Sequence, residues 1–359
     1  MNTARLLKQP CAWLPTGHDA SITVSSRVRL ARNRKDAAFP GWAGEEECER
    51  IWEELHGILT ACQSLTEPLS VGMGDLGALD RQVLFERHLI SREHAERKRG
   101  SGVVLRPDES VAIMVNEEDH LRMQCIRRGL DLVRAWEEVN ALDSEVERGV
   151  DYAFSPQIGY LTACPSNVGT GMRASVMLHV PGLVLMNEIN AVVKGMAKIG
   201  LAVRGLWGEG SEAIGNMFQV SNQMTLGERE EDIVSSLEQV VLEIVEHEKN
   251  ARARLFEQRE HIIRDHVGRA VGILSHAHVL TSKECMDLLS DLRLGLDMGI
   301  VHMQRPEVVN DLLILTQPGH LQKVEGRKLK AEERDEARAL LVRSRVKKAL
   351  QQRTRKKDE

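Results

Sequence analysis

The sequence predicts an α+β protein, in which a domain of strands and helices extends to about residue 250 and a helical domain follows. Two observations support this class. Apolar and polar residues alternate with a period of two in short segments of the first half, whereas from about residue 228 onward apolar residues recur at helical spacing. No internal repeat or low-complexity linker interrupts the 359 residues, so the boundary rests on the change of period alone.

The first predicted strand runs from Ile22 to Leu30, where apolar and polar residues alternate as in a half-buried strand. One face is expected to carry the apolar side chains of Ile22, Val24, Val28 and Leu30. The opposite face is expected to carry the polar side chains of Ser25, Arg27 and Arg29. Two guanidinium groups therefore share one face of this strand.

Three further segments of the first half indicate regular structure. A strand is predicted from Ser110 to Asn116, and it leads directly into the acidic turn Glu117-Glu118-Asp119-His120. A short strand from Gly159 to Thr162 enters a loop that contains proline and glycine. Regular structure resumes from Ala174 to Val180.

The second half has the signals of helices. Thr225-Leu-Gly-Glu228 matches a capping box, and the apolar residues that follow it form one helical stripe. Thr281-Ser-Lys-Glu284 repeats the capping signal, and Pro306 and Pro318 mark breaks between helices. The stripe is made of Ile233, Leu237, Val240, Val241, Ile244 and Val245.

Composition excludes several classes of protein. Hydrophobic residues make up 42% and charged residues 28%, so a core can form, and the 3% of aromatic residues argues against a stacking platform for single-stranded nucleic acid. Residues 343–359 hold eight basic and two acidic residues in a chain of net charge −5, so an acidic body carries a short basic tail. Six irregularly spaced cysteines without a CxxC pair, and no signal peptide, predict a soluble cytoplasmic protein.

Known phosphate-binding and hydrolytic motifs are absent. The sequence has no GxxxxGK[ST], HExxH, GxSxG or kinase HRD…DFG set, so arginines must bind any phosphate. Each candidate arginine has an ordinary alternative as a salt-bridge partner, and the acidic turn could be a solvated turn. Their occurrence together in one domain favours a polyphosphate site, because arginine donates two parallel hydrogen bonds and keeps its charge. The candidates are Arg27, Arg29, Arg122, Arg173 and Arg204.

Four separated motifs resemble the catalytic domain of the phosphagen (guanidino) kinases. They are Ser25-Ser-Arg-Val-Arg29, Asn116-Glu-Glu-Asp-His-Leu-Arg122, Cys164-Pro-Ser-Asn-Val-Gly-Thr-Gly-Met-Arg173 and the loop from Arg204 to Gly210. The segment from Gly205 to Gln219, followed by Ser221-Asn-Gln223, is more specifically similar to the bacterial protein arginine kinases. The resemblance covers roughly residues 20 to 250 and implies an antiparallel sheet flanked by helices.

Two departures from the small-guanidine kinases concern the ends of the chain. Only about twenty residues precede Ser25, where those kinases have a sizeable helical domain, and a helical region follows that they lack. We therefore expect an N-terminal segment (1–20), a catalytic domain (21–250), a helical domain (251–345) and a basic tail (346–359). By resemblance, Arg334-Asp-Glu-Ala-Arg-Ala339 is a phosphoarginine-binding motif through Arg334, Asp335 and Arg338; alone, it could be an ordinary charged helix face.

The resemblance also implies the catalytic residues. An arginine guanidinium is protonated and a poor nucleophile, so carboxylates must orient it and accept a proton as the N–P bond forms. Glu118 is expected to be the base and Glu209 the second clamp on the guanidinium. Cys164 is expected to be a thiolate that positions the guanidinium electrostatically, without a phosphocysteine intermediate.

The cofactors implied are ATP and Mg²⁺, with the magnesium ion held mainly by the nucleotide and water, so no protein ligand is assigned to it. Arginines are expected on the phosphates and His88 near the nucleotide, while Gly169 and Gly171 permit close backbone approach. The predicted nucleotide-binding residues are Ser25, Ser26, Arg27, Val28, Arg29, His88, Arg122, Arg173, Ala174, Ser175, Val176, Met177, Arg204, Gly205, Leu206, Trp207, Gly208 and Glu209.

The function implied is ATP-dependent phosphorylation of arginine side chains in proteins. Two alternatives stay open: a kinase for free arginine or another small guanidine, and an adaptor that only binds phosphoarginine. By family analogy, we expect a bacterial stress response, an activator protein, a Clp-type protease and a homodimer. No direct contact with nucleic acid or membrane is expected.

Overall fold

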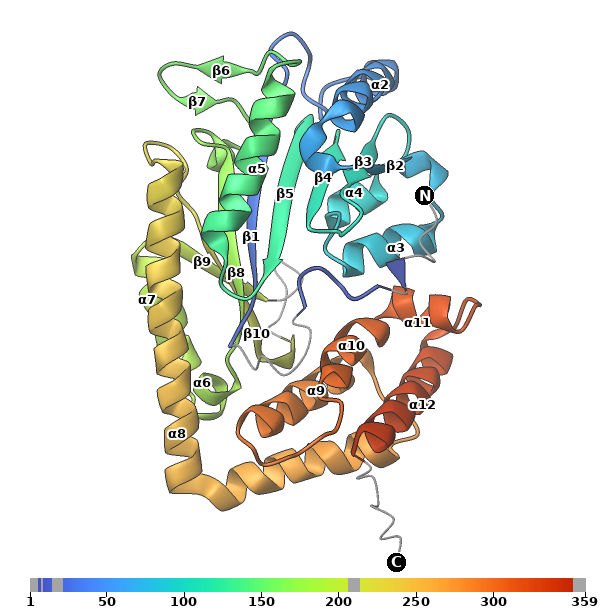
Figure 1. Cartoon of the computed structure of the whole chain (residues 1–359), viewed down its shortest axis with the longest axis vertical. Helices are drawn as coiled ribbons and strands as arrows, with labels where there is room; N and C mark the ends of the chain where they lie inside the picture. The colour runs from blue at the N-terminus through green and yellow to red at the C-terminus, as the bar shows by residue number, and fades with distance from the viewer. Residues whose placement is uncertain (1–5, 8, 15–21, 206–213, 351–359) are drawn as a thin grey trace, which may run out of the picture.

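In the computed structural model, which describes residues 6, 7, 9–14, 22–205 and 214–350, the first half forms an antiparallel sheet of eight strands in the order β2-β3-β4-β5-β1-β8-β10-β9 (Figure 1). A separate hairpin joins β6 (Phe154–Ser155) and β7 (Gly159–Tyr160). This sheet and the helical region after it confirm the predicted fold class. The strands of the sheet are β1 (Thr23–Arg32), β2 (Leu69–Gly72), β3 (Gly102–Leu105), β4 (Val111–Val115), β5 (Leu121–Arg128), β8 (Met172–His179), β9 (Leu201–Gly205) and β10 (Met217–Asn222).

Helices cover the sheet and continue beyond it. The largest core packs one face of the sheet against α2 (Glu45–Ala61), α5 (Leu132–Glu147) and the first half of α8 (Glu230–His276). The remaining helices of the strand-containing half are α3 (Ala78–Glu86), α4 (Arg92–Glu96), α6 (Pro181–Leu185) and α7 (Ile189–Lys198). The helical region adds α9 (Ser282–Asp297), α10 (Glu307–Leu315), α11 (Pro318–Val324) and α12 (Ala331–Leu350).

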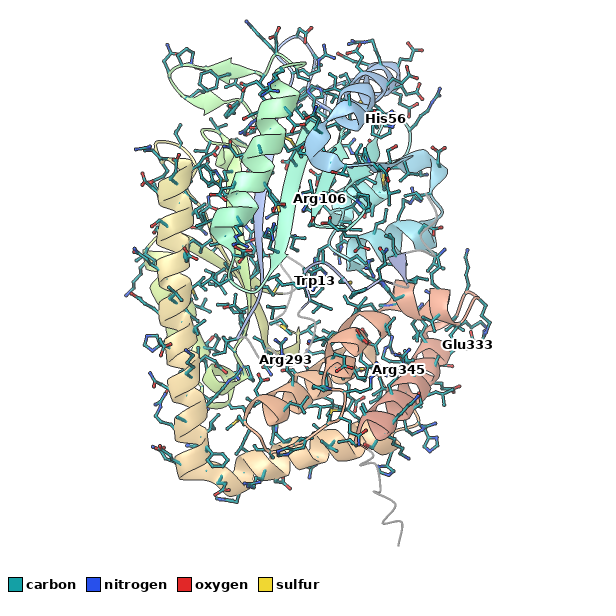
Figure 2. The ribbon with its side chains drawn as sticks, in the orientation of Figure 1. Trp13, His56, Arg106, Arg293, Glu333 and Arg345 are labelled. Carbon is teal, nitrogen blue, oxygen red and sulfur yellow. The ribbon has the colours of Figure 1, made fainter. Side chains whose placement is uncertain are left out.

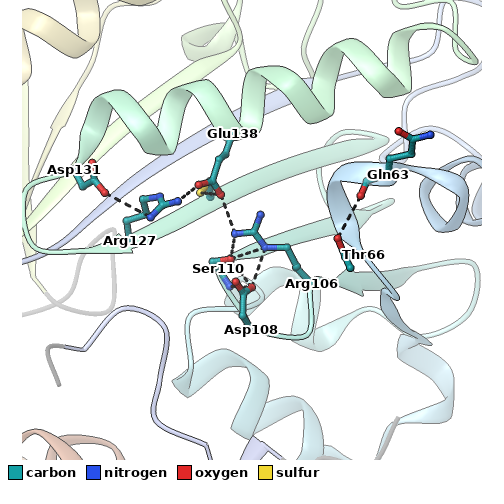
Figure 3. Close-up of polar contacts among 9 residues, drawn as sticks. Gln63, Thr66, Arg106, Asp108, Ser110, Arg127, Asp131 and Glu138 are labelled. Carbon is teal, nitrogen blue, oxygen red and sulfur yellow. Dashed lines mark hydrogen bonds and ion pairs between the residues drawn. The ribbon is translucent and has the colours of Figure 1, made fainter.

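Polar contacts fix α5 on the sheet (Figure 3). The carboxylate of Glu138 on α5 accepts a hydrogen bond from Arg106 at 2.8 Å and forms an ion pair with Arg127 on β5. Ser110 and Asp108 hold the other side of the Arg106 guanidinium. One carboxylate therefore ties the helix to two segments of the sheet.

The prediction for the first strand needs one correction. Val28 and Leu30 lie in the largest core as expected, but Val24 packs in a second buried cluster. The register between β1 and β8 shifts between Thr23 and Ser25, and such an irregularity breaks the simple alternation of faces. The expectation that Val24 shares a face with Val28 is therefore wrong.

The two predicted helix starts differ in outcome. The hydroxyl of Thr281 accepts a hydrogen bond from the backbone N–H of Glu284 and caps α9, as predicted. The capping box at Thr225 is wrong, because α8 begins at Glu230 and its N-cap, Arg229, makes no side-chain capping bond. Thr225 instead donates its hydroxyl proton to a neighbouring loop, which is described below.

The second buried cluster joins the helical region to the sheet. Side chains of α9, α10 and α12 pack there with Val24, Ile126 and Met177 of the sheet. Trp13, from the segment before the first strand, is buried in the same cluster, and Figure 2 shows it between the sheet and the C-terminal helices. The chain's beginning and end thus share one core.

One helix crosses the predicted domain boundary. α8 starts beside the sheet, departs from helical geometry at Arg259 (φ −141°, ψ 35°) and continues under the C-terminal helices (Figure 1). The division at residue 250 stays a prediction. Within the described part of the chain, none of the helices has the length and apolarity needed to cross a bilayer.

Gly102 on β3 provides a test of this packing. A Cβ atom there would lie 2.2 Å from the ring of Trp52 on α2, whereas a Cβ at Gly57, in the same helix, would have no neighbour within 4 Å. We expect Gly102→Ala to lower the free energy of unfolding by about 1–3 kcal/mol through overpacking. Gly57→Ala should raise it by about 0.5–1 kcal/mol through helix propensity. Chemical denaturation measures both, and equal effects would contradict the packing of Trp52.

Candidate active site

Four arginines project from adjacent strands in the middle of the sheet. In the strand register, Arg29 of β1 lies opposite Arg173 of β8 and Gln124 of β5, and Arg122 lies two residues before Gln124. Arg27 precedes Arg29 by two residues, so its side chain shares the same face. Antiparallel pairing therefore brings together four of the five arginines that the sequence predicted for phosphate.

The guanidinium groups of the cluster repel one another. Burial, together with the charges of Arg122 and Arg173, lowers the pKa of Arg27 to about 10. Burial and the same neighbours, with Arg27, hold the pKa of Arg29 well below its usual range. The buried Nε of Arg29 has no hydrogen-bond partner among the described residues. A bound anion would relieve this repulsion, so the cluster has the character of a phosphate site.

Neutral side chains of β10 hold two of these guanidinium groups. Arg27 donates to Gln219 Oε1 at 3.1 Å, and Arg173 donates to Ser221 Oγ at 3.3 Å. Gln219 and Ser221 are neutral, so these two contacts orient the guanidinium groups without adding a counter-charge. Arg204, on the edge strand β9, lies opposite Gln219 in the strand register. It therefore stands beside the residue that holds Arg27.

Glu117 is the carboxylate that neutralises part of the cluster. Its two oxygens lie 2.7 and 2.8 Å from Arg122 Nη1, and Ser91 donates its hydroxyl proton to Oε1 at 2.5 Å. Burial alone would raise the pKa of Glu117, but the ion pair with Arg122 and these hydrogen bonds outweigh it and lower the pKa to about 2. Glu117 therefore stays ionised as a fixed partner of Arg122.

Glu118, the predicted base, has a different environment from its two acidic neighbours. Its side chain is exposed and has no hydrogen-bond partner among the described residues, whereas Glu117 and Asp119 are buried. Partial desolvation, followed by repulsion from Asp119 and Glu117, raises its pKa. A carboxylate with a raised pKa and a free face has the properties of a general base.

Asp119 ties the acidic turn to the loop of the predicted cysteine. Asp119 Oδ1 accepts hydrogen bonds from Asn33 Nδ2 at 2.6 Å and from the backbone N–H of Ala163 at 2.7 Å. The amide oxygen of Asn33 in turn accepts the backbone N–H of His120 at 2.9 Å. Glu118 and Cys164 thus come from two segments that share one buried carboxylate.

The cysteine loop is held from both ends. Cys164 is half-buried, and its Sγ lies 3.0 Å from Ser166 Oγ. The Thr225 hydroxyl lies 3.0 Å from the carbonyl oxygen of Ser166 and 2.7 Å from that of Val168, so one O–H donor is shared between them. Gly169 has φ +115°, and a Cβ there would lie 2.3 Å from the carbonyl oxygen of Thr225. The close approach that Gly169 permits is therefore an approach to the chain's own backbone.

Arg32, at the end of β1, supports the same loop through a hydrogen bond to its backbone. Its guanidinium donates to Asp143 Oδ2 at 2.7 and 3.0 Å and to the carbonyl oxygen of Thr170 at 2.9 Å. It also lies 3.6 Å from the centroid of the Tyr160 ring. Removing either partner of such a buried pair costs about 3–5 kcal/mol, so Arg32 is a structural arginine rather than a free one.

A pocket lies beside the arginine cluster, lined by part of the predicted nucleotide set. His88 reaches it from the end of α3, and burial, with the charges of Arg27 and Arg29, lowers the pKa of His88 to about 3, so the ring is neutral. The ring edge packs on Trp13 with centroids 4.7 Å apart. The lining residues are Ser25, Arg27, His88, Ile126, Ser175, Met177 and Gln219.

Several other predicted nucleotide-binding residues do not face this pocket or lie outside the described residues. Val28, Ala174 and Val176 are buried in the largest core on the opposite face of the sheet. Ser26 donates to the carbonyl oxygen of Gly129 and accepts from the N–H of Asp131. These side chains alternate with those that face the pocket, as strand geometry requires. Gly205 ends β9, and Leu206, Trp207, Gly208 and Glu209 lie outside the described residues.

The predicted phosphoarginine motif lies on α12, apart from the sheet. The guanidinium of Arg338 is buried and donates to the carbonyl oxygens of Thr316, at 2.9 Å, and Leu280, at 2.7 Å, and to Asp335 Oδ1 at 2.5 Å. Arg334 donates to the carbonyl oxygen of Leu329 at 3.3 Å. Arg338 therefore joins three segments of the helical region, and binding of phosphoarginine stays a prediction.

Sequence reasoning missed several residues that hold the site in place. Arg32 and Asn33 lie three and four residues after Arg29, the end of the recognised arginine motif, and Asp119 lies inside the acidic turn. Their positions in the chain were therefore a signal. Thr225 was a false signal, since its local pattern matches a helix cap. The side chains concerned are Arg32, Asn33, Ser91, Asp119, Asp143 and Thr225.

Comparison with known proteins agrees with this geometry. The family model of the ATP:guanido phosphotransferase C-terminal catalytic domain matches residues 53–251, and that of the protein-arginine kinase McsB C-terminal domain matches residues 260–357. A protein-arginine kinase of Desulforamulus reducens is 46% identical over 341 residues, which cover 93% of this chain and 95% of the relative. Another, from Bacillus subtilis, is 43% identical over 338 residues, covering 93% of each chain.

Two solved structures have a similar fold. The duplicated taurocyamine kinase from Schistosoma mansoni, with bound transition-state-analogue components, matches with a TM-score of 0.60 and 26% identity over 68% of this chain and 35% of its own. Lombricine kinase matches with a TM-score of 0.57 and 22% identity over 69% of this chain and 71% of its own, a likeness of fold alone.

The arrangement of Thr225 predicts a specific change in the cysteine loop. Thr225→Val keeps the shape of the side chain but removes the donor that two loop carbonyls share. Loss of about 1 kcal/mol should speed hydrogen exchange of the amides in residues 164–170 about fivefold. Thr60→Val is the matched control, because the Thr60 hydroxyl bonds only within α2. Unchanged exchange in Thr225→Val would contradict the assigned contact.

The charge imbalance of the arginine cluster predicts binding of a polyphosphate. Saturating tripolyphosphate should raise the thermal unfolding midpoint, because a ligand at about 100 times its Kd adds about 2.7 kcal/mol to stability. Arg29→Met should remove most of the rise, since its guanidinium is buried without sufficient counter-charge. Arg134→Met, on the exposed surface of α5, should leave it unchanged. An equal rise in both variants would show that the ion binds elsewhere.

Proposed function

The chain belongs to the ATP:guanido phosphotransferase family and, within it, to the protein-arginine kinases, and on that premise we propose that the residues described above transfer phosphate from ATP to protein arginines. The activity is ATP-dependent phosphorylation of arginine side chains in proteins. The finer assignments, namely the role of each residue, the metal ion and the partners, are our proposals.

We propose that the arginine cluster binds the phosphates. Phosphoryl transfer needs the moving group held in line and its charge neutralised, and little covalent help from protein. The support is the unneutralised charge of Arg27 and Arg29, which lie side by side with Arg173 on paired strands. Arg122, already paired with Glu117, completes the row next to the acidic turn. Arg204 is proposed to extend it.

We propose that Glu118 accepts the proton of the substrate guanidinium. The single observation that carries the proposal is the contrast within the turn: Glu117 and Asp119 are buried and hydrogen-bonded, while Glu118 is exposed and has a raised pKa. A carboxylate can both fix the plane of a guanidinium and take its proton. Glu209 is proposed as a second clamp by resemblance, and it lies outside the described residues.

Cys164 is proposed to position the guanidinium electrostatically as a thiolate. Support comes from its half-buried location, its contact with the Ser166 hydroxyl at 3.0 Å, and the hydrogen bond that joins its loop to the acidic turn through Asp119.

Mg²⁺ is proposed to arrive with ATP. The arginines fit the phosphates, while Glu117 and Asp119 are already committed to Arg122, Asn33 and the loop backbone. The residues of this site are thus arranged for phosphate, and the ion would be held mainly by the nucleotide and water. When bound, it neutralises part of the phosphate charge.

Several biological properties are proposed from family membership alone. Protein substrates follow from the activity. An activator protein, delivery of marked proteins to a Clp-type protease, a homodimer, a cytoplasmic location and a role in the stress response are proposals. So are recognition of phosphoarginine by Arg334, Asp335 and Arg338 and the division of the chain into catalytic and helical domains.

The test is mass spectrometry under non-acidic conditions, because N–P bonds are labile in acid. The chain, incubated with ATP, Mg²⁺ and an unfolded protein, should produce phosphoarginine on that protein and little on free arginine. Glu118→Gln should lower the rate about 10²–10⁴-fold through loss of the base. Glu53→Gln, an exposed carboxylate on α2, is the matched control and should keep full activity.

Stability separates a lost base from a lost fold. Because the pKa of Glu118 is raised in the folded state, the stability tied to its protonated form is present at low pH and is lost as the pH rises through that pKa. At neutral pH the neutral glutamine avoids this cost, so Glu118→Gln should unfold at the same or a higher temperature. Near-full activity of this variant would overturn the assigned role, and product from free arginine alone would make the chain a small-guanidine kinase.

A further inference from the structure

We propose that Glu86 and His320 are positioning residues for the nucleotide: through their contact, helix α11 of the C-terminal region sets the affinity for ATP. The inference rests on the proposed function, because it takes the pocket beside Arg27 and His88 as the nucleotide site. It gives a role to a buried acid and a buried imidazole that the phosphoryl-transfer site does not use.

Glu86 is one of the residues through which α3 contacts α11, which lies beside it (Figure 1). The Glu86 carboxylate is 1% exposed and accepts three hydrogen bonds from α11: from the backbone N–H of Gly319 at 2.7 Å, from that of His320 at 3.0 Å, and from His320 Nδ1 at 2.7 Å. His320 is fully buried. A Cβ at Gly319 would lie 2.8 Å from a carboxylate oxygen of Glu86, so a larger residue there would displace this carboxylate. Residues more than 230 positions apart are thus locked together.

Two residues after Glu86, the chain reaches the pocket. α3 ends in a Schellman turn, in which His88 N–H bonds the Phe85 carbonyl at 2.9 Å and Leu89 N–H bonds the Leu84 carbonyl at 3.0 Å. His88 takes the left-handed position of this turn, with φ 59°, which glycine usually occupies. The direction of the His88 ring therefore depends on the last turn of α3, which contains Glu86.

The left-handed backbone of His88 has a cost that its surroundings must offset. For a non-glycine residue that conformation costs about 1–2 kcal/mol. Arg87 is fixed by Glu109 through two bonds of 2.8 Å, and Gln124 donates to the His88 carbonyl at 2.6 Å. Glu86, held by α11, is a further anchor of this turn. Strain that persists only because several contacts over-determine it is typical of a residue placed for a ligand.

Loss of the contact between Glu86 and His320 should therefore weaken ATP binding. Glu118 and Cys164 lie on the 117–119 turn and the 162–169 loop, whose hydrogen bonds to each other run through Asp119 and not through α3. We expect the KM for ATP to change more than kcat when the contact between Glu86 and His320 is removed.

The experiment compares two substitutions of His320 in the full chain. His320→Leu removes the side-chain donor, while His320→Asn places an amide N–H near the position of Nδ1. We expect His320→Leu to raise both the KM for ATP and the calorimetric Kd for Mg-ATP about tenfold, with kcat within about twofold. His320→Asn should restore most of the affinity. Lys323→Ala is the matched control: it breaks the Asp80–Lys323 ion pair between the same two helices and should leave both constants unchanged.

A double-mutant cycle tests whether the effect passes through His88. In a His88→Asn background, chosen because asparagine tolerates the left-handed region, His320→Leu should have no further effect on the Kd. Additive effects, or an unchanged Kd in His320→Leu, would reduce the pair to a stability role and overturn the proposal. Glu86→Gln serves as a second variant if His320→Leu does not fold. Calorimetry measures ATP binding and needs no protein substrate. If the wild type binds Mg-ATP but forms no phosphoarginine, the proposed function fails independently of this inference.

Discussion

Four guanidinium groups from three paired strands lie close together, and the repulsion between them is the constraint on which the site depends. Antiparallel register puts Arg27, Arg29, Arg122 and Arg173 on one face, where Glu117 forms an ion pair with Arg122. Burying like charges opposes folding. Hydrogen bonds to β10 and the large core on the opposite face help to offset that cost. A bound polyphosphate would relieve the repulsion between the guanidinium groups.

The reactive segments are held by contacts that themselves take no part in chemistry. Asp119 joins the acidic turn to the cysteine loop, Thr225 supports that loop from the start of the second half, and Arg32 supports it from β1. Each contact links segments far apart in sequence. Because the loop has little regular structure of its own, its shape depends on these three long-range partners.

Much of the fold and part of the site could be predicted from the sequence, where the signal was local. Alternation along β1 placed Arg27 and Arg29 together, and the Thr281 pattern marked the start of α9. Long-range effects could not be read in this way. Thr225 has the local pattern of a helix cap, yet its hydroxyl bonds a loop some sixty residues earlier. A contiguous motif also includes residues whose side chains do not face the pocket, since Val28 and Val176 alternate into the core. Nothing in the sequence near Glu86 indicates a partner more than 230 residues away.

The shared core of the two chain ends has a consequence for biosynthesis. Trp13 and Leu14 leave the ribosome long before Val342 and Val346 of α12, which belong to the same buried cluster. Domains generally fold as the chain is made, beginning with the N-terminal part. Here the cluster around Trp13 lacks part of its apolar surroundings until α12 has been made, although most of its sheet residues are already present. Translation to the end of α12 is thus required before the core that joins the sheet to the helical region is complete.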